Sequence, residues 1–296
     1  MPSVTTSDGV DVAVHDLGGE GHPALLAHAT GLHGLVWTPL AARLADRFHC
    51  VSFDTRGHGD SGLPSEAELD WYGFARDVLA VVDGLGLERP YGVGHSSGAT
   101  ALLLAEEARP GTFEALYCFE PVIVPVHPPL GRDRGNWLAS AARRRREVFP
   151  SRADALGNYA SKPPFASVEP DALRAYVDHG FEDLDEGGVR LKCRAETEAV
   201  TNEMASAHDC FGRLSRVRCP VALAGGSETD ALRPSTLEAQ ARPLPFAHTE
   251  ILPGLTHLGP LEDPEAVALS IRRFFGRQGP AMGAPARLRA GRSGGS

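Results

Sequence analysis

The segment Tyr91-Gly-Val-Gly94-His95-Ser96-Ser97-Gly98 decides the predicted fold of this 296-residue chain. An apolar strand pattern leads into a Gly-His-Ser-Ser-Gly pentapeptide, and the helix-forming run Ala99 to Ala108 follows at once. Gly94 and Gly98 lack β-carbons, so the strand and the helix can approach closely around a residue held in an unfavourable backbone conformation. A strained turn of this kind exposes a serine oxygen, and the pattern therefore predicts Ser96 as a nucleophile.

Two other interpretations of this segment have to be weighed. A Gly-rich turn can simply join a strand to a helix, and this interpretation stays open. A dinucleotide-binding loop starting at Gly92 would need glycine where Ser97 stands, and no Gly-Lys-Ser/Thr follows to form a P-loop. Nucleotide binding is therefore disfavoured.

Working outward from this segment, short apolar runs alternate with helical patterns on both sides. The predicted strands are 10–15, 24–27, 50–53, 91–94, 115–119, 220–224 and 248–252, and the predicted helices are 38–46, 71–85, 97–108, 235–241 and 264–275. Alternation of this kind is typical of the α/β class, with a mostly parallel sheet flanked by helices.

The alternation of strand and helix patterns is interrupted once. Residues 125–218 are polar, Arg-rich and Pro-punctuated, with helical patterns and no strong strand except 189–192. We interpret them as an inserted, mainly helical cap, here called the cap region, between two parts of the core, 1–124 and 219–275. Residues 276–296 are rich in Gly, Pro, Ala and Arg and are predicted to be a disordered tail.

A serine nucleophile needs a histidine to take its proton and an acid to orient that histidine. His257 is the predicted base because it follows the last predicted strand and precedes the final helix. The acid is expected after the strand ending at Ala224, where Asp230 is favoured and Glu228 is the alternative. Either carboxylate can instead cap the next helix.

The developing negative charge on a substrate oxygen needs backbone N–H donors, predicted to be those of Ser97 and Thr30. Thr30 lies in a loop directly after the strand ending at Ala27, although a plain turn is the alternative there. Nearby side chains are candidate substrate contacts or, equally, scaffold and core: His28, His33, His95 and Trp37. Phe165 and Trp137 of the cap region are further candidates for lining an acyl pocket.

The composition limits which partners and which cellular location are expected for this protein. With 29 basic and 38 acidic residues the formal net charge is -9, and no basic half favours nucleic acid or a membrane surface. The five cysteines are scattered without metal-site or disulfide spacing, and no export signal or membrane-spanning run is present, so a cytoplasmic protein is expected. The run Arg143–Arg146 is expected to be mostly a solvated helix face.

These features together resemble the α/β-hydrolase superfamily over nearly the whole chain apart from the cap region and the tail. The stretch Phe53-Asp54-Thr55-Arg56-Gly57-His58-Gly59-Asp60-Ser61 resembles that family's Asp-x-Arg-Gly-x-Gly-x-Ser turn, which implies an architectural role for Asp54 and Arg56. Gly226-Ser-Glu-Thr-Asp230-Ala-Leu232 is similar to a family motif that carries the acid. Some members place the acid after an earlier strand instead, which makes Glu120 a reserve acid.

The resemblance departs from the family pattern at the oxyanion loop, where the usual His-Gly is His28-Ala29. The leading hypothesis is hydrolysis of a small or medium ester, lactone or thioester by a Ser96–His257–acid triad, with a small-molecule substrate and water as partners and no metal or organic cofactor. Carbon–carbon bond hydrolysis or a non-hydrolytic biosynthetic step on the same scaffold is the runner-up. A small-molecule receptor with a slow triad is the alternative from another class. The sequence sets neither the substrate nor the oligomeric state.

Overall fold

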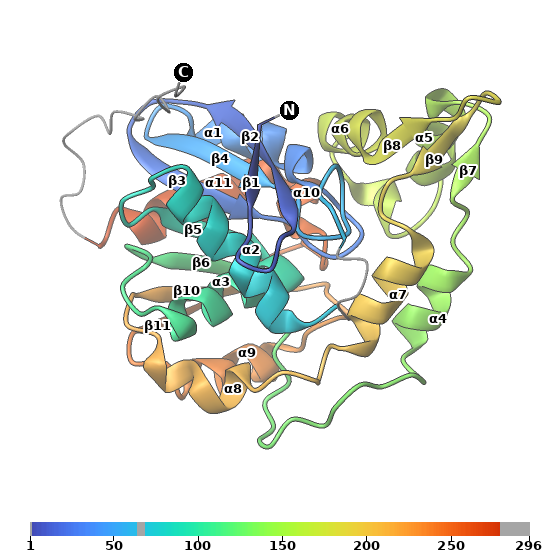
Figure 1. Ribbon diagram of the computed structural model, residues 1–296. Coiled ribbons are helices and arrows are strands. Elements are labelled where there is room, and N and C mark those ends of the chain that lie inside the picture. Colours follow the sequence, from blue (N-terminus) through green and yellow to red (C-terminus); the bar gives the residue numbers. More distant parts are fainter. Residues whose placement is uncertain (1, 64–68, 279–296) are drawn as a thin grey trace, which may run out of the picture.

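The structure is a computed structural model that describes residues 2–63 and 69–278, and its elements surround one central sheet (Figure 1). The sheet has the strand order β1-β2-β4-β3-β5-β6-β10-β11. Its strands are β1 (Ser3–Thr5), β2 (Asp11–Gly18), β3 (His22–Ala27), β4 (Phe48–Phe53), β5 (Tyr91–His95), β6 (Leu116–Phe119), β10 (Val221–Gly226) and β11 (Ala247–Leu252). Within this sheet the neighbours β4, β3, β5, β6, β10 and β11 pair in parallel, whereas β2 pairs antiparallel with β1 and β4. The predicted α/β class with a mostly parallel sheet is confirmed.

Helices cover both faces of this sheet because its strands are buried on both sides and read as apolar runs. On one face lie α1 (Thr38–Leu44) and α11 (Pro264–Phe275), and on the other lie α2 (Trp71–Gly84), α3 (Ser97–Ala108) and α9 (Pro234–Ala241). The short helices η1 (Gly34–Trp37) and α10 (Gly259–Glu262) join core elements. Helix α2 begins where the Asp70 carboxylate accepts a hydrogen bond from the Gly73 N–H, an N-cap contact.

The cap region has more strand than the sequence pattern indicated. Its helices are α4 (Trp137–Arg143), α5 (Arg152–Ala160), η2 (Phe165–Ser167), α6 (Pro170–Gly180), α7 (Ala195–Glu203), α8 (Cys210–Arg213) and η3 (Leu214–Arg216). A second sheet, ordered β7-β9-β8, is formed by β7 (Val148–Phe149), β9 (Val189–Leu191) and β8 (Phe181–Asp183). Only the strand near Val189 was predicted. In Figure 1 these strands gather with α5 and α6 on one side of the molecule, next to α4 and α7.

The turn after β4 holds the core together. The buried Asp54 carboxylate accepts hydrogen bonds from the N–H groups of Gly34, at 2.6 Å, and Asp60, at 2.8 Å. The Arg56 guanidinium is 2% exposed and forms ion pairs with Asp77, at 2.7 Å, and Asp8, at 2.8 Å. Since this buried carboxylate and this guanidinium find their hydrogen-bond and ion-pair partners inside the scaffold, these contacts fit the architectural role expected of the turn.

The predicted disordered tail and the expected lack of a membrane-spanning segment can be compared with the described residues. Of the predicted disordered tail only residues 276–278 are described, and the rest lies outside the described residues. Within residues 2–63 and 69–278, no helix has the length and apolar character that crossing a membrane requires.

Candidate functional site

Ser96 lies in the turn between β5 and α3 with the backbone angles φ 54° and ψ −117°. This left-handed conformation is costly for a residue with a β-carbon. A β-carbon at position 94 would stand 2.4 Å from the Ala99 Cα, and one at position 98 would stand 2.3 Å from the Ala27 carbonyl oxygen. Only glycine fits at both places, so the two glycines permit the tight turn that presents Ser96.

His257 lies on the loop between β11 and α10, and its Nδ1 is 2.6 Å from Oε2 of Glu120. The Glu120 side chain is fully buried, while 29% of the His257 side chain stays exposed. The carbonyl of His257 also lies 2.8 Å from Nε2 of His95, the residue before Ser96, and the two imidazole rings are 4.9 Å apart. His257 is therefore held beside the Ser96 turn with its Nδ1 occupied, and its Nε2 has no hydrogen-bond partner among the described residues.

Glu120 follows β6 directly and has φ 47°, a left-handed conformation like that of Ser96. Its carboxylate accepts three hydrogen bonds from described groups. Oε1 accepts from the Gly226 N–H at 2.9 Å, and Oε2 accepts from the Thr229 hydroxyl at 2.9 Å and from His257 Nδ1. These three donors fix the orientation of the carboxylate and keep its Oε2 aimed at the imidazole.

Among the described contacts, His257 pairs with Glu120 and not with Asp230, the acid that the sequence favoured. Asp230 is exposed on the loop after β10, and the alternative, Glu228, is also exposed and accepts a hydrogen bond from the Ser227 hydroxyl at 3.0 Å. The loop instead contributes the Thr229 hydroxyl and the Gly226 N–H to the carboxylate from the neighbouring strand end. The reserve acid, Glu120, is the residue in contact with His257.

The loop after β3 reaches the first turn of α3, as the predicted oxyanion site requires. A β-carbon on Gly98 would lie 2.3 Å from the carbonyl oxygen of Ala27 and 2.5 Å from that of His28, so this loop and the helix start touch. Ser97 is the first residue of α3, where N–H groups have no partner within the helix. The Thr30 N–H has no acceptor among the described residues either. Both predicted donors thus remain free to bind an oxyanion.

The contacts of His28 and His33 are those of scaffold residues and do not favour the expectation that they touch a substrate. His28 is completely buried, donates from Nδ1 to the Ala29 carbonyl at 2.8 Å and accepts the Thr55 N–H on Nε2 at 3.0 Å. Burial lowers the pKa of His28 to about 3 and that of His33 to about 4, so both rings are neutral. His33 Nε2 lies 3.2 Å from the Tyr176 carbonyl.

His95 and Trp37 are likewise not placed to touch a substrate. His95 is completely buried, and its Nε2 lies 2.8 Å from the His257 carbonyl, a contact that holds the His257 loop beside the Ser96 turn. Trp37 is 1% exposed and packs in the core beneath α1. Trp137, by contrast, is 69% exposed on α4. Of the aromatic candidates, Phe165 alone lies in a cluster of polar and aromatic side chains, described below.

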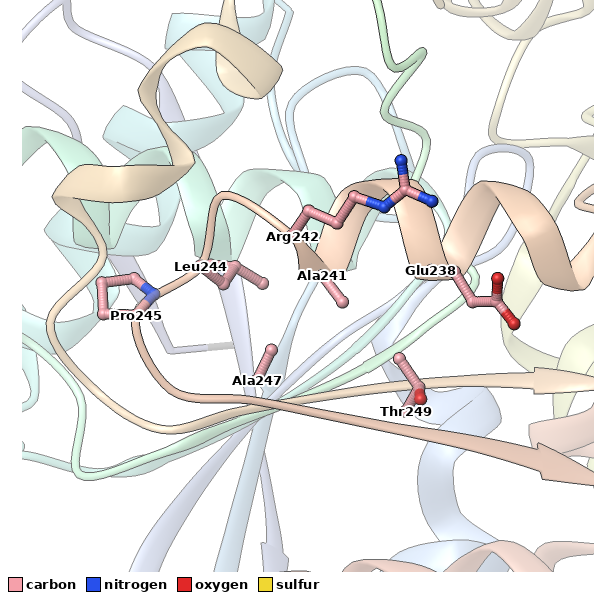
Figure 2. A pocket seen from close by; sticks show the side chains of 7 residues that line it. All are labelled: Glu238, Ala241, Arg242, Leu244, Pro245, Ala247 and Thr249. Carbon is pink, nitrogen blue, oxygen red and sulfur yellow. The ribbon is translucent and has the colours of Figure 1, made fainter.

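An open hollow elsewhere on the surface is separate from this site. It lies between α9 and the edge strand β11 and is lined by Glu238, Ala241, Arg242, Leu244, Pro245, Ala247 and Thr249 (Figure 2). None of these is a predicted site residue. In the described chain no three His, Cys, Asp or Glu side chains come together in a way that would hold a metal ion.

This chain is similar to known proteins over most of its length. The model of the alpha/beta hydrolase family matches residues 24–269. The chain is 24% identical over 257 residues to 2-(acetamidomethylene)succinate hydrolase of Mesorhizobium japonicum, covering 87% of this chain and 89% of that protein. It is 27% identical to a putative carbamate hydrolase of Caulobacter sp., covering 71% of this chain and 84% of that protein.

Among solved structures, E-2-(acetamidomethylene)succinate hydrolase superposes with a TM-score of 0.79 at 23% identity, covering 93% of this chain and 99% of that one. At this level of identity the likeness concerns the fold. The family match begins within β3 and ends within α11, and it includes the Ser96 turn and the His257 loop. The chain belongs to the alpha/beta hydrolase family.

Proposed function

We propose that this protein hydrolyses a small carboxylic ester or amide through an acyl-enzyme on Ser96, with His257 as base and Glu120 as the acid of the triad. The observation that carries the proposal is the 2.6 Å contact between His257 Nδ1 and Glu120, beside the strained turn that presents Ser96. The same arrangement serves esters, lactones, thioesters and amides, because each passes through a tetrahedral oxyanion.

The chemistry follows from which atoms are free. Among the described residues the Ser96 hydroxyl makes no hydrogen bond, so it closes on His257 Nε2 when substrate binds. Nε2 takes the proton as Oγ attacks the carbonyl carbon, and the N–H groups of Ser97 and Thr30 receive the oxyanion. His257 then protonates the leaving group, and a water molecule activated by Nε2 releases the acid from Ser96.

Glu120 acts through His257. Its carboxylate holds the proton on Nδ1, which leaves Nε2 unprotonated and ready to accept, and it stabilises the imidazolium that forms. The name of one relative, a hydrolase of an acetamido-substituted succinate, supports a substrate that carries carboxylate groups. All five cysteines are free and buried, which supports a reducing, cytoplasmic location.

A fluorophosphonate probe tests the mechanism. We expect one equivalent of label on the peptide that contains Ser96 and loss of activity in proportion to labelling, whereas Ser96→Ala takes no label and is inactive. The substrate panel contains acyl esters, lactones and N-acyl amides of graded chain length. An unlabelled protein that is active, or a Ser96→Ala variant with wild-type turnover, rules this mechanism out. Tight ligand binding without turnover would instead favour a receptor.

A further inference from the structure

Arg145 differs from its neighbours in the run Arg143–Arg146. Its side chain is 16% exposed, whereas Arg144 and Arg146 are exposed and Arg143 forms ion pairs with Glu196 and Glu203, both at 2.8 Å. Helix α4 ends at Arg143, so the following arginines are not on a helix and need not all point to solvent. The expectation of a solvated helix face is wrong for Arg145.

Aromatic rings enclose the Arg145 guanidinium. Its central carbon is 5.5 Å from the ring centre of Tyr159, 5.9 Å from that of Tyr176 and 6.0 Å from that of Phe165. Tyr176 is 1% exposed and Tyr159 is 7% exposed. Cation–π contacts and hydrogen bonds to this guanidinium are thus shielded from bulk water, where they are stronger than on an open surface.

The hydrogen bonds of this cluster leave donors without acceptors. Arg145 Nη1 donates to Glu198, and Nη2 donates to the hydroxyl oxygens of both Tyr159 and Tyr176. A hydroxyl that accepts from arginine must direct its own proton elsewhere, and no described residue accepts a hydrogen bond from either tyrosine. Burial raises the pKa of Tyr176 well above its usual value, so its proton is retained. The Nε–H of Arg145 also has no acceptor among the described residues.

This donor cluster lies against the catalytic end of the core. A β-carbon on Gly31, the residue after Thr30, would be 3.0 Å from the Glu198 carboxylate carbon. The carbonyl of Tyr176 is bound by His33, two residues further along the same loop. The Arg145 cluster therefore packs against the oxyanion loop, and the start of the same loop touches the first turn of α3.

We propose that Arg145, Tyr159 and Tyr176 form a subsite that binds a carboxylate on the acyl part of the substrate. A carboxylate has acceptors only, which complements a site whose unused groups are donors, and a guanidinium binds it with charge-assisted hydrogen bonds. Glu198 takes one side of the guanidinium and holds it against the oxyanion loop. The inference rests on the proposed hydrolase function and adds its substrate class, a short dicarboxylic half-ester or half-amide.

The test compares two esters that differ in one group. Mono-p-nitrophenyl succinate carries a free carboxylate where p-nitrophenyl butyrate carries a methyl group. We expect kcat/KM for the succinate ester to exceed that for the butyrate ester in the wild type. Arg145→Met should lower kcat/KM for the succinate ester by about 10- to 100-fold and that for the butyrate ester by less than about threefold.

Two further variants separate recognition from folding. Tyr176→Phe keeps the ring and the Arg145–Glu198 pair but removes one hydroxyl, and should lower kcat/KM for the succinate ester selectively by about fivefold. Arg144→Met changes an exposed arginine next in sequence and should leave both esters unaffected. Equal losses on both esters in Arg145→Met and in Tyr176→Phe, or an unchanged succinate-to-butyrate ratio, would overturn the subsite.

A binding measurement keeps this proposal distinct from the proposed function. Calorimetry on Ser96→Ala uses monomethyl succinate and methyl butyrate as probes. We expect the former to bind and to lose at least about tenfold in affinity when Arg145→Met is added. Binding of this kind in a protein that hydrolyses no ester would leave the subsite standing and the proposed function refuted. Ester hydrolysis without preferential binding of monomethyl succinate would refute the subsite and leave the proposed function standing.

Discussion

Replacing Glu120 by glutamine is the substitution that best tests whether Glu120 or Asp230 is the acid of the triad. Glu120→Gln keeps the size and shape of a buried side chain whose two oxygens accept from Gly226, Thr229 and His257. At the Oε1 position a glutamine NH2 group would face the Gly226 N–H, donor against donor. At the Oε2 position it can be accommodated, because the Thr229 hydroxyl can rotate to accept and His257 can change tautomer.

The second arrangement is expected, and it inactivates the base. His257 Nδ1 would accept from the amide, so the imidazole proton would move to Nε2, the atom that has to take the Ser96 proton. In serine hydrolases a wrong tautomer of this kind lowers kcat by about 10⁴-fold, or about 5 kcal/mol of transition-state stabilisation. We expect a fall of about 10³- to 10⁴-fold in kcat with KM changed by less than about threefold.

The assay is steady-state hydrolysis of the best ester from the substrate panel, with thermal unfolding to confirm that the variant is folded. Asp230→Asn is the matched control, since Asp230 is exposed and should retain activity within about threefold of the wild type. Near wild-type turnover in Glu120→Gln together with a large loss in Asp230→Asn would refute the assignment of the acid.

The remaining predictions concern the core. Burial raises the pKa of Glu107 to about 8, although Cys210, Arg213 and Arg216 oppose the shift. Its carboxyl therefore keeps a proton in the folded chain but ionises near its ordinary value when unfolded, so its contribution to stability is lost as pH rises toward 8. Glu107→Gln should stabilise the protein by about 2 to 4 kcal/mol more at pH 8 than at pH 5 in urea unfolding, whereas the exposed Glu88→Gln should show no such difference. An equal effect at both pH values would contradict this assignment. Gly98→Ala brings a methyl group within 2.5 Å of two carbonyl oxygens and should destabilise the chain by about 3 kcal/mol while lowering kcat, whereas Gly157→Ala, with open space at an exposed position of α5, should be neutral or stabilising. A well-folded, fully active Gly98→Ala variant would show that the contact between the oxyanion loop and α3 is dispensable.

The fold was predictable from sequence because local signals repeat along the core. Apolar runs and helical patterns mark the strands β2, β3, β4, β5, β6, β10 and β11 of the central sheet and every long core helix, and the Ser96 turn fixes where strand meets helix. The cap region gave weaker signals, since its strands β7 and β8 are two and three residues long and pair only with β9. A strand of two or three residues is too short to show the alternation of apolar and polar side chains that marks a strand in the sequence.

The proposed acid, Glu120, was harder to predict because two neighbouring strands end at the same place. Strands β6 and β10 pair in register from Leu116 with Val221, so carboxylates after either strand can reach the His257 loop. What decides between them is the left-handed backbone of Glu120 and the wrapping of the next loop around its carboxylate. Neither is visible in the sequence, and a motif around Asp230 points to the wrong side of that loop. The burial of Arg145 was hidden for a similar reason, because the end of α4 at Arg143 is a tertiary outcome.

The backbone strain itself links nucleophile and acid. Among the described non-glycine residues, positive φ occurs at Arg89, Ser96 and Glu120, and the last two stand at the ends of paired strands, where His95 lies opposite Phe119. The Ser96 N–H donates to the Phe119 carbonyl at 2.9 Å, so the turn that presents the nucleophile is tied to the residue before the acid. Each strained residue costs about 1 to 3 kcal/mol, and such strain persists where the surroundings over-determine it. With Glu120 after β6 as the proposed acid, both strained residues lie in one hydrogen-bonded unit, and His257 from the last loop contacts Glu120.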